Sequence, residues 1–407
     1  MEILINSKLL TTTLKLVKPL IKRVHLPILY YGLITSNKES ITFEVTNLDT
    51  SIKQVIPCTV IEQGSCLINL NQLISILGSE KSDIKITSDN EKTQIQIGNT
   101  TAKLDFMETC NFPEWVLLNN YIMSDTTNQD LFNAEDVENM NRISYSVLDQ
   151  DSRFNLNNIA IVDNKIVATD GHRLALEPLS HDFNYGYPVL IPKPICNLIY
   201  KTMKKCNVFF EYYNHYIVAY TPHNIIGSKP VTTIVWRRTE GDYPDYKRVI
   251  PDRDMSPVTK IVLDKKSLVH AIDQLKAFTT KDNNTIEITA NSHLNLSVGT
   301  DMVEIITLQK EKCELLQDIN LKQHQLNKLE SINTKLQKLQ TIAVSIPIDK
   351  KSGYDFSILI DPDYLSECIK ATTEKDVSLA YFKEGSPIRI TSYPTDKNYS
   401  ILMPRRK

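Results

Sequence analysis

One structural plan occurs three times along the 407-residue chain, although its letters are not repeated. In each round an amphipathic helix, with apolar residues at helical spacing, is followed later by a second helix and then by strands of alternating polarity. This succession predicts three α+β domains, because a chain of this length does not build one ordinary core. The six predicted helices cover residues 7–21, 69–77, 134–147, 193–206, 265–278 and 361–371.

The third round contains an insertion of about 35 residues. Residues 309–340 contain no Gly or Pro and are rich in Leu, Lys, Gln and Asn, which predicts a helical hairpin between two strands. A dimerising coiled coil is less favoured, because Lys322 and Asn333 interrupt a strict heptad. We expect a short Gly-Ser loop in its place to leave the fold and any dimer intact. The predicted domains cover residues 1–124, 125–253 and 254–407, with the insertion near 309–341 in the third.

Composition places the chain among globular proteins, with 42% hydrophobic and 23% charged residues. The formal net charge of −2 means that any DNA contact must come from local clusters of the 46 basic residues. No apolar run approaches the roughly 20 residues of a membrane span, and the start lacks the pattern of a signal peptide. We therefore expect a cytoplasmic protein with no membrane partner. The seven cysteines are scattered, odd in number and without a C-x-x-C motif, which favours buried thiols over a disulfide framework.

Two segments mix charged, aromatic, Gly and Pro residues more densely than a plain strand or helix does. They are residues 168–174 (ATDGHRL) and residues 240–251 (EGDYPDYKRVIP). Gly171 suits a turn with positive φ, and Pro244 fixes the chain locally and offers a rigid apolar surface. Together the segments predict two walls of a recognition pocket.

Both segments resemble, nearly letter for letter, the signature stretches of the bacterial sliding clamp, the beta subunit of DNA polymerase III. The resemblance extends over nearly the whole chain apart from the insertion. Four further stretches are similar to motifs of the same family: residues 26–29 (LPIL), 46–49 (TNLD), 151–154 (DSRF) and 401–404 (ILMP).

The resemblance implies three tandem DNA-clamp domains, each with two helices packed on antiparallel sheets. Two chains would form a head-to-tail homodimer, a six-domain ring around double-stranded DNA that reads no base sequence. Such a ring is a non-catalytic processivity factor without a cofactor or metal. It tethers the DNA polymerase III alpha subunit, is opened by a clamp loader, and binds other replication and repair proteins.

The resemblance also implies a pocket for a partner peptide, with apolar walls and a few oriented donors. Arg405 departs from the family pattern, because an apolar residue usually stands there. The pocket residues implied in this way are Leu156, Thr169, Gly171, His172, Arg173, Leu174, Pro244, Arg248, Val249, Pro387, Leu402, Met403, Pro404 and Arg406.

Two lysine clusters on predicted helices can meet phosphates without reading bases. They are Lys15, Lys18 and Lys22 on the first helix, and Lys201, Lys204 and Lys205 on the second helix of the second round. By resemblance, Arg23, Gln150, Phe154 and Asn155 also lie near the DNA path. For the dimer, the family pattern implies that Ala102 and Leu104 face Phe278 of the second chain.

Two alternatives remain open at this point. Asp170 and His172 are an acid/base pair that a hydrolase or phosphatase could use, although no nucleophile lies nearby in the sequence and no Gly-rich phosphate loop or metal-spaced His cluster is present. A specialised clamp paralogue with altered partners is the other alternative, and the insertion and Arg405 favour it.

Overall fold

The structure is a computed structural model that describes most of the 407 residues. Outside the described part lie residues 22–24, 78–81, 90, 114–127, 149–152, 184, 222–230, 252–255, 281–283, 300–301, 317–322, 339–340, 397 and 406–407. The chain forms two compact units. Unit 1 comprises Met1–Asn141, Ile161–Asn164 and Leu179–Asp242, and unit 2 comprises Arg142–Ala160, Lys165–Pro178 and Tyr243–Lys407. The predicted boundaries near 124 and 253 lie outside the described residues, so the division into three domains stays a prediction.

Unit 1 contains two antiparallel sheets. In the first, the strand order is β5 (Thr59–Glu62), β1 (Glu2–Ile5), β7 (Ile84–Ser88), β8 (Thr93–Ile97) and β9 (Thr100–Leu104). In the second, the order is β10 (Asn128–Phe132), β15 (Val208–Tyr212), β16 (Tyr216–Tyr220), β17 (Val231–Arg237), β4 (Thr50–Pro57), β3 (Ser40–Thr46), β2 (Tyr31–Ser36) and β6 (Ser65–Asn69). The pairing of β17 with β4, from Val231↔Val55 to Trp236↔Thr50, joins two rounds of the repeated plan through backbone hydrogen bonds.

Four helices described in unit 1 pack their apolar faces inward. They are α1 (Ser7–Val17), α2 (Leu70–Leu77), α4 (Ala134–Ile143) and α5 (Lys193–Met203), which follows β14 (Val189–Pro192). Asn6 caps α1, because its Oδ1 accepts the backbone N–H of Lys8 at 3.0 Å. Helix α1 buries Leu10 and Leu14 and contacts both α2 and α5.

Unit 2 also contains two sheets with antiparallel pairing. Seven of its strands run in the order β12 (Lys165–Thr169), β13 (Arg173–Pro178), β26 (Tyr399–Leu402), β25 (Ile388–Tyr393), β24 (Asp376–Tyr381), β18 (Thr259–Asp264) and β22 (Lys350–Gly353), and β11 (Asn158–Val162) precedes them in the chain. A four-stranded sheet has the order β21 (Thr341–Pro347), β20 (His293–Gly299), β19 (Ile286–Ala290) and β23 (Phe356–Ile360).

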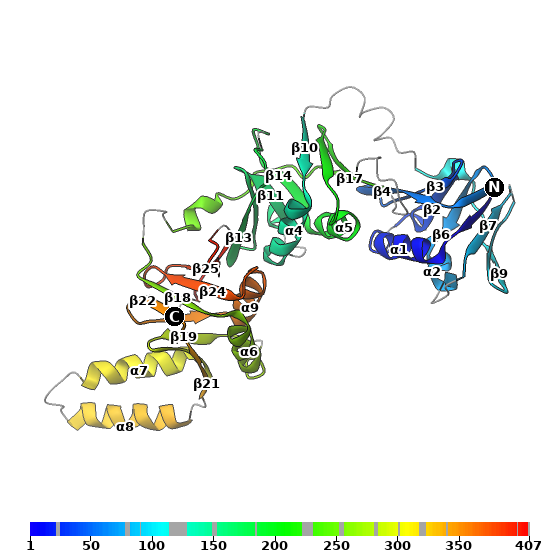
Figure 1. Ribbon diagram of the computed structural model, residues 1–407. Coiled ribbons are helices and arrows are strands. Elements are labelled where there is room, and N and C mark those ends of the chain that lie inside the picture. The colour runs from blue at the N-terminus through cyan, green and yellow to red at the C-terminus, as the bar shows by residue number, and fades with distance from the viewer. Residues whose placement is uncertain are drawn as a thin grey trace. The chain divides into compact units, whose positions relative to one another are not determined.

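Helices α6 (Lys265–Lys276) and α9 (Pro362–Lys370) pack against each other in unit 2 and share one core with the strands. Leu268, Ile272, Leu365 and Ile369 are fully buried in that core. The inserted segment forms two further helices between β20 and β21, α7 (Met302–Leu316) and α8 (Gln323–Lys338), which lie side by side in Figure 1. The first of them begins seven residues before the predicted start at 309.

Several predicted helices are longer than the observed ones. The chain leaves the α-helix after Val17, Ile143, Met203 and Lys276, and a turn or a 3₁₀ segment follows. Apolar periodicity continues through such a tightened last turn, so the sequence alone overestimates the length. Within the described part of the chain, every helix is too short or too polar to cross a lipid bilayer.

Gly353 is required where β22 meets β18. Its φ is +102°, and a Cβ there would lie 1.9 Å from the carbonyl oxygen of Val258. We expect Gly353→Ala to lower the free energy of unfolding by about 3 kcal/mol, because backbone strain and a hard overlap add together. Gly385→Ala is the matched control, since its φ is +74° but no atom lies within 4 Å; we expect a loss of about 1 kcal/mol there. Urea denaturation measures the free energy of unfolding of both variants. Equal losses would show that the overlap with Val258 does not destabilise Gly353→Ala.

Candidate functional site

A largely apolar pocket of about 320 Å³ lies in unit 2, and four segments that are distant in the sequence line it. The 3₁₀ turns 154–157 and 246–249 form two walls, the turn between β12 and β13 a third, and the end of β26 the fourth. The lining residues are Arg153, Leu156, Thr169, Gly171, Arg173, Leu174, Pro244, Asp245, Tyr246, Val249, Ile401 and Met403.

Backbone pairing of β13 with β26 brings the first signature segment next to the C-terminal stretch. Arg173 is paired with Leu402, and Leu174 with Ile401. Beyond the strand, the backbone N–H of Met403 donates to the carbonyl oxygen of His172 at 3.0 Å. Residues from opposite ends of unit 2 therefore meet at one pocket wall.

The turn between β12 and β13 is fixed by its own side chains. The carboxylate of Asp170 accepts the backbone N–H groups of His172 at 2.9 Å and Arg173 at 3.0 Å. The hydroxyl of Thr169 donates to the carbonyl oxygen of Arg173 at 2.7 Å. Gly171 has a φ of +87°, as predicted from the sequence.

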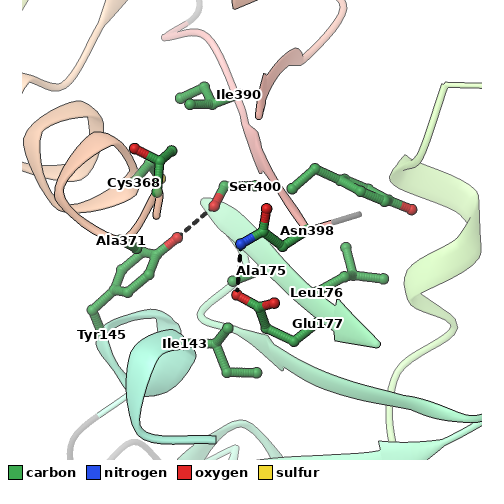
Figure 2. Close-up of a pocket in the computed structure, with 12 residues that line it drawn as sticks. Ile143, Tyr145, Ala175, Leu176, Glu177, Cys368, Ala371, Ile390, Asn398 and Ser400 are labelled. Atoms are coloured by element: carbon green, nitrogen blue, oxygen red, sulfur yellow. Dashed lines mark hydrogen bonds between the residues drawn. The ribbon is translucent and has the colours of Figure 1, made fainter. Parts of the chain in front are cut away.

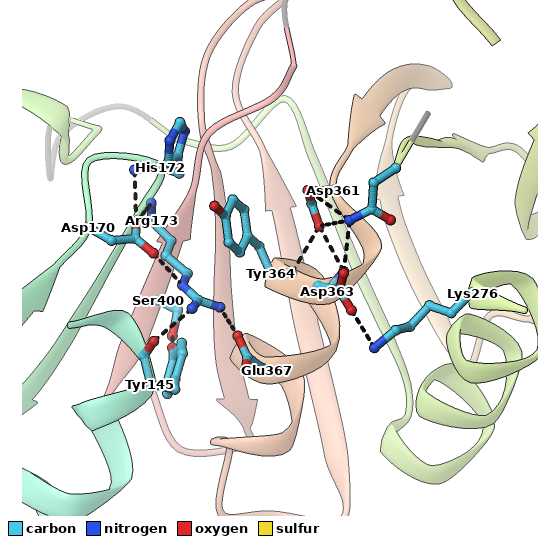
Figure 3. A network of polar contacts seen from close by, with 11 residues as sticks. Tyr145, Asp170, His172, Arg173, Lys276, Asp361, Asp363, Tyr364, Glu367 and Ser400 are labelled. Carbon is cyan, nitrogen blue, oxygen red and sulfur yellow. Dashed lines mark hydrogen bonds and ion pairs between the residues drawn. The ribbon is translucent and has the colours of Figure 1, made fainter. Parts of the chain in front are cut away.

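Arg173 connects this turn with helix α9 (Figure 3). Its Nε donates to Asp170 at 3.0 Å, its Nη1 pairs with Glu367 of α9, and its Nη2 donates to the carbonyl oxygen of Tyr145 at 2.7 Å. The guanidinium also lies 4.5 Å from the ring centroid of Tyr364. Burial lowers the pKa of Arg173, but the pairs with Glu367 and Asp170 outweigh that effect and raise it. The buried cation is therefore permanent.

The structure brings together eight of the residues that the resemblance implied: Leu156, Thr169, Gly171, Arg173, Leu174, Pro244, Val249 and Met403. Other members of that set lie elsewhere. Leu402 is fully buried, and the exposed Arg248 pairs with Asp245 at 2.9 Å. The His172 ring stacks on Tyr364 at 5.5 Å. Pro387 is half-buried and is not among the residues that line the pocket, and Arg406 lies outside the described residues.

Sequence reasoning missed four of the lining residues: Arg153, Asp245, Tyr246 and Ile401. Each lies inside or beside a motif that was already singled out, so proximity to the motif was the available signal. Tyr246 is buried, and it also lines the pocket.

A second recess of about 320 Å³ shares Met403 with the pocket. It is lined by Ser357, Ile358, Leu359, Tyr381, Glu384, Gly385, Ser386, Met403, Pro404 and Arg405. Arg405 is held in place, since its backbone N–H donates to Leu359 at 2.8 Å and its guanidinium pairs with Asp361 at 2.7 Å. The residue that departs from the family pattern is thus a fixed, partly exposed cation at the edge of this recess.

A third cavity lies beneath β13 and α9 and is too small for a ligand (Figure 2). Its volume is about 10 Å³, room for one water at most. Tyr145 and Ser400 share a hydrogen bond of 2.6 Å there, and Asn398 donates to Glu177 at 3.3 Å. Burial raises the pKa of the Cys368 thiol in its wall to about 11, so this cysteine is an unreactive packing residue.

The geometry of Asp170 and His172 does not support an acid/base pair. The Asp170 carboxylate binds the backbone N–H of His172 and the side chain of Arg173, while the His172 ring stacks on Tyr364. Among the described residues, no group of His, Cys, Asp and Glu is arranged to hold a metal ion.

The predicted DNA-contacting lysines that the structure describes are exposed: Lys15, Lys18, Lys201, Lys204 and Lys205. The first two lie at the end of α1 and the others at the end of α5, and these helices touch in unit 1. Phe154 is exposed and Asn155 half-buried, both in unit 2. Lys22, Arg23 and Gln150 lie outside the described residues.

The three predicted dimer residues differ in exposure. Phe278 follows α6 and is 56% exposed. Ala102 is half-buried and Leu104 is buried on β9, the last strand of the five-stranded sheet. Among the three, Phe278 therefore offers the most exposed surface to a second chain.

Arg173 and Arg248 offer a matched pair of substitutions. We expect Arg173→Met to lower the free energy of unfolding by about 3 kcal/mol, because the buried Asp170 carboxylate loses its cation. Arg248→Met should change it by less than about 0.5 kcal/mol, because its side chain is 83% exposed. Urea denaturation compares the two, and similar losses would refute the structural role assigned to Arg173.

Comparison with known proteins places the chain beside bacterial sliding clamps. It is 20% identical to the beta sliding clamp of Rickettsia felis over 99% of both chains, and 27% identical to that of Buchnera aphidicola over 65% of this chain and 72% of that protein. The DNA polymerase sliding clamp of Bacillus subtilis superposes on 100% of this chain and 99% of its own, with a TM-score of 0.77 at 17% identity.

The sliding clamp of Bartonella birtlesii, solved with griselimycin bound, covers 100% of both chains with a TM-score of 0.79 at 18% identity. No protein-family model matches the chain. The predicted resemblance to bacterial sliding clamps is confirmed, and the chain has the sliding-clamp fold.

Proposed function

We propose that this chain is a DNA sliding clamp, a ring that encircles duplex DNA and tethers a replicative polymerase to it. The observation that carries the proposal is the likeness to sliding clamps along the whole chain, in sequence and in fold. The hydrolase alternative has no support, because the residues that it requires form a structural turn. The proposed protein is a non-catalytic cytoplasmic subunit.

For the DNA contact we propose the exposed lysines of α1 and α5. These side chains lie on adjoining helices of one unit, so their charges add along one surface although the whole chain has a net charge of −2. Lysine binds phosphate as a flexible point charge, and this suits contacts that slide along the duplex without base preference. Phe154, Asn155, Lys22, Arg23 and Gln150 stay predictions from the resemblance.

For the homodimer we propose that β9 of one chain pairs with β21 of another. Each of these strands ends its sheet in the described part of the structure, and an exposed edge readily pairs with a second chain. Because β9 belongs to unit 1 and β21 to unit 2, such a contact is head-to-tail, and two copies close it into a ring. We call this proposed β9–β21 contact the seam.

For partner proteins we propose peptide binding in the main pocket and the adjoining recess. The DNA polymerase III alpha subunit, a clamp loader and other replication or repair proteins are the proposed partners. Apolar walls with a few fixed polar groups suit a short segment with Leu or Phe anchors. The fixed cation Arg405 and the α7–α8 hairpin favour a specialised clamp with its own partner selection.

The dimer tests the proposed function most directly. Light scattering should give twice the mass of one chain at micromolar concentration, and electron microscopy should show a ring. Phe278→Asp should shift the protein towards monomer, because the family pattern sets the exposed Phe278 against Ala102 and Leu104 of the second chain, where the substitution would bury an unpaired charge. Tyr354→Asp is the control, since that side chain is 78% exposed and precedes β23, which lies at the opposite edge of the sheet from β21. A concentration-independent monomer for the unaltered chain would contradict the clamp.

Met403 tests the pocket separately from the ring, because it lines both recesses. We expect Met403→Ala to weaken binding of a polymerase-derived peptide with Gln and Leu/Phe anchors by about tenfold, as for an anchor at a small hot spot. The dimer should stay intact. Calorimetric titration gives the affinities, with Tyr354→Ala as the control. Unchanged affinity would show that the pocket is misplaced.

A further inference from the structure

We propose that the α7–α8 hairpin is a second contact at the seam, and that it binds the edge of unit 1 in a second copy of this chain. This inference rests on the proposed dimer, because the hairpin is inserted at the strand edge that the dimer would use. The contact joins the last turn of α8 to the segment that follows β9.

The position of the hairpin in the fold ties it to the seam. It connects β20 with β21, and β21 is the last strand of its sheet. Helix α8 ends at Lys338 and β21 begins at Thr341, so two residues separate the helix from the edge strand. Figure 1 shows both helices projecting together from this end of unit 2. A chain that pairs with β21 therefore lies beside the end of α8.

Antiparallel pairing of β21 with β9 would determine which segment of the second copy lies beside α8. The strands next to both edges are antiparallel, as β20 with β21 and β8 with β9. If β21 continues this pattern against β9, its first residues lie opposite the last residues of β9. The segment 105–108, which follows β9, is then placed beside the last turn of α8.

The charges on the two sides are complementary. Residues 105–108 read Asp-Phe-Met-Glu, and Asp105 and Glu108 are both exposed. The last four residues of α8, 335–338, contain two lysines and no acid, and Lys335 is exposed. Asp105 and Glu108 on one side would thus lie near Lys335 on the other, and this opposite charge would add attraction and orient the approach.

Exposed apolar side chains lie at the same junction. Ile342, near the start of β21, is 38% exposed, although Val344 and Ile346 on the same strand face pack into or against the core. Phe106, just after β9, is 36% exposed. Pairing of the two edges would cover both, so the charged contact has an apolar neighbour that gains from exclusion of water.

Helices α7 and α8 pack against each other, and α7 also contacts β20. Leu308 and Ile332 are buried, Lys328 pairs with Glu311 at 3.6 Å, and no described residue of the hairpin belongs to the main core cluster. The expectation that it is dispensable for the fold therefore stands. The expectation that its removal leaves the dimer intact is replaced, because the hairpin would contribute to the seam.

Charge reversal in the full-length protein tests the contact. We expect Lys335→Glu to raise the dimer dissociation constant about fivefold at low salt. The substitution turns an attraction to the acidic segment 105–108 into a repulsion, and exposed charge pairs have effects of this size. Lys335→Glu combined with Glu108→Lys should restore it, because every seam then contains both reversed charges. Lys310→Glu is the matched control, an exposed lysine about 12 Å along α7 from its first residue. Sedimentation velocity over a dilution series gives the constants.

Removal of the hairpin is the second test. With a Gly-Ser loop in place of residues 302–338, the rest of the chain should keep its secondary structure, measured by circular dichroism, and its cooperative unfolding. The dimer dissociation constant should rise at least about tenfold. If this variant and Lys335→Glu both dimerise like the unaltered protein, the hairpin contact is refuted while the clamp proposal survives. If the unaltered protein is monomeric at every concentration, the clamp proposal and the hairpin contact both fail.

Discussion

The pairing of β13 with β26 is the interaction on which the site depends. It lays residues 173–176 against residues 399–402 and so brings the first signature segment to the C-terminal stretch. The turn before β13 is fixed by Asp170, and the chain after β26 continues the contact from Met403 to His172. The pocket walls follow from this one register, since Leu174 and Ile401 are partners in it and both line the cavity.

Arg173 converts that register into a rigid connection with helix α9. Burying a guanidinium is costly, and its pairs with Asp170 and Glu367 offset much of that cost without a large net gain in stability. What the arrangement provides is a defined geometry, because one planar group with fixed donors must meet a carboxylate on each side and a backbone carbonyl. Unlike Arg248, whose side chain is exposed and does not line the pocket, Arg173 therefore holds one pocket wall in a defined orientation.

Features that the sequence encodes locally were predictable, and features that need two distant segments were not. Helix starts follow from side chains such as Asn6 and Asp264, which accept backbone N–H groups of their own first turns. The resemblance implied a pocket that includes Leu402, yet neighbours on a strand point to opposite faces. Ile401 lines the cavity and Leu402 enters the core. The pair of Arg405 with Asp361 joins residues 44 apart, beyond any local pattern.

The edge strands β9 and β21 are central both to the proposed dimer and to the role of the inserted α7–α8 hairpin. An open edge pairs with any extended chain unless charge or bulk restricts it. On β9 the exposed Lys103 supplies such a charge, and on β21 the α7–α8 hairpin stands at the first residue of the strand. In the proposed dimer, a hairpin in that place would block a partner strand that continues far past the start of β21, and it would favour one whose chain turns away soon after the paired strand. The segment after β9 has this property, since residues 109–111 form a 3₁₀ turn that contacts β6 of its own unit. In the proposed dimer the same element would thus exclude other partners and select a second copy of this chain.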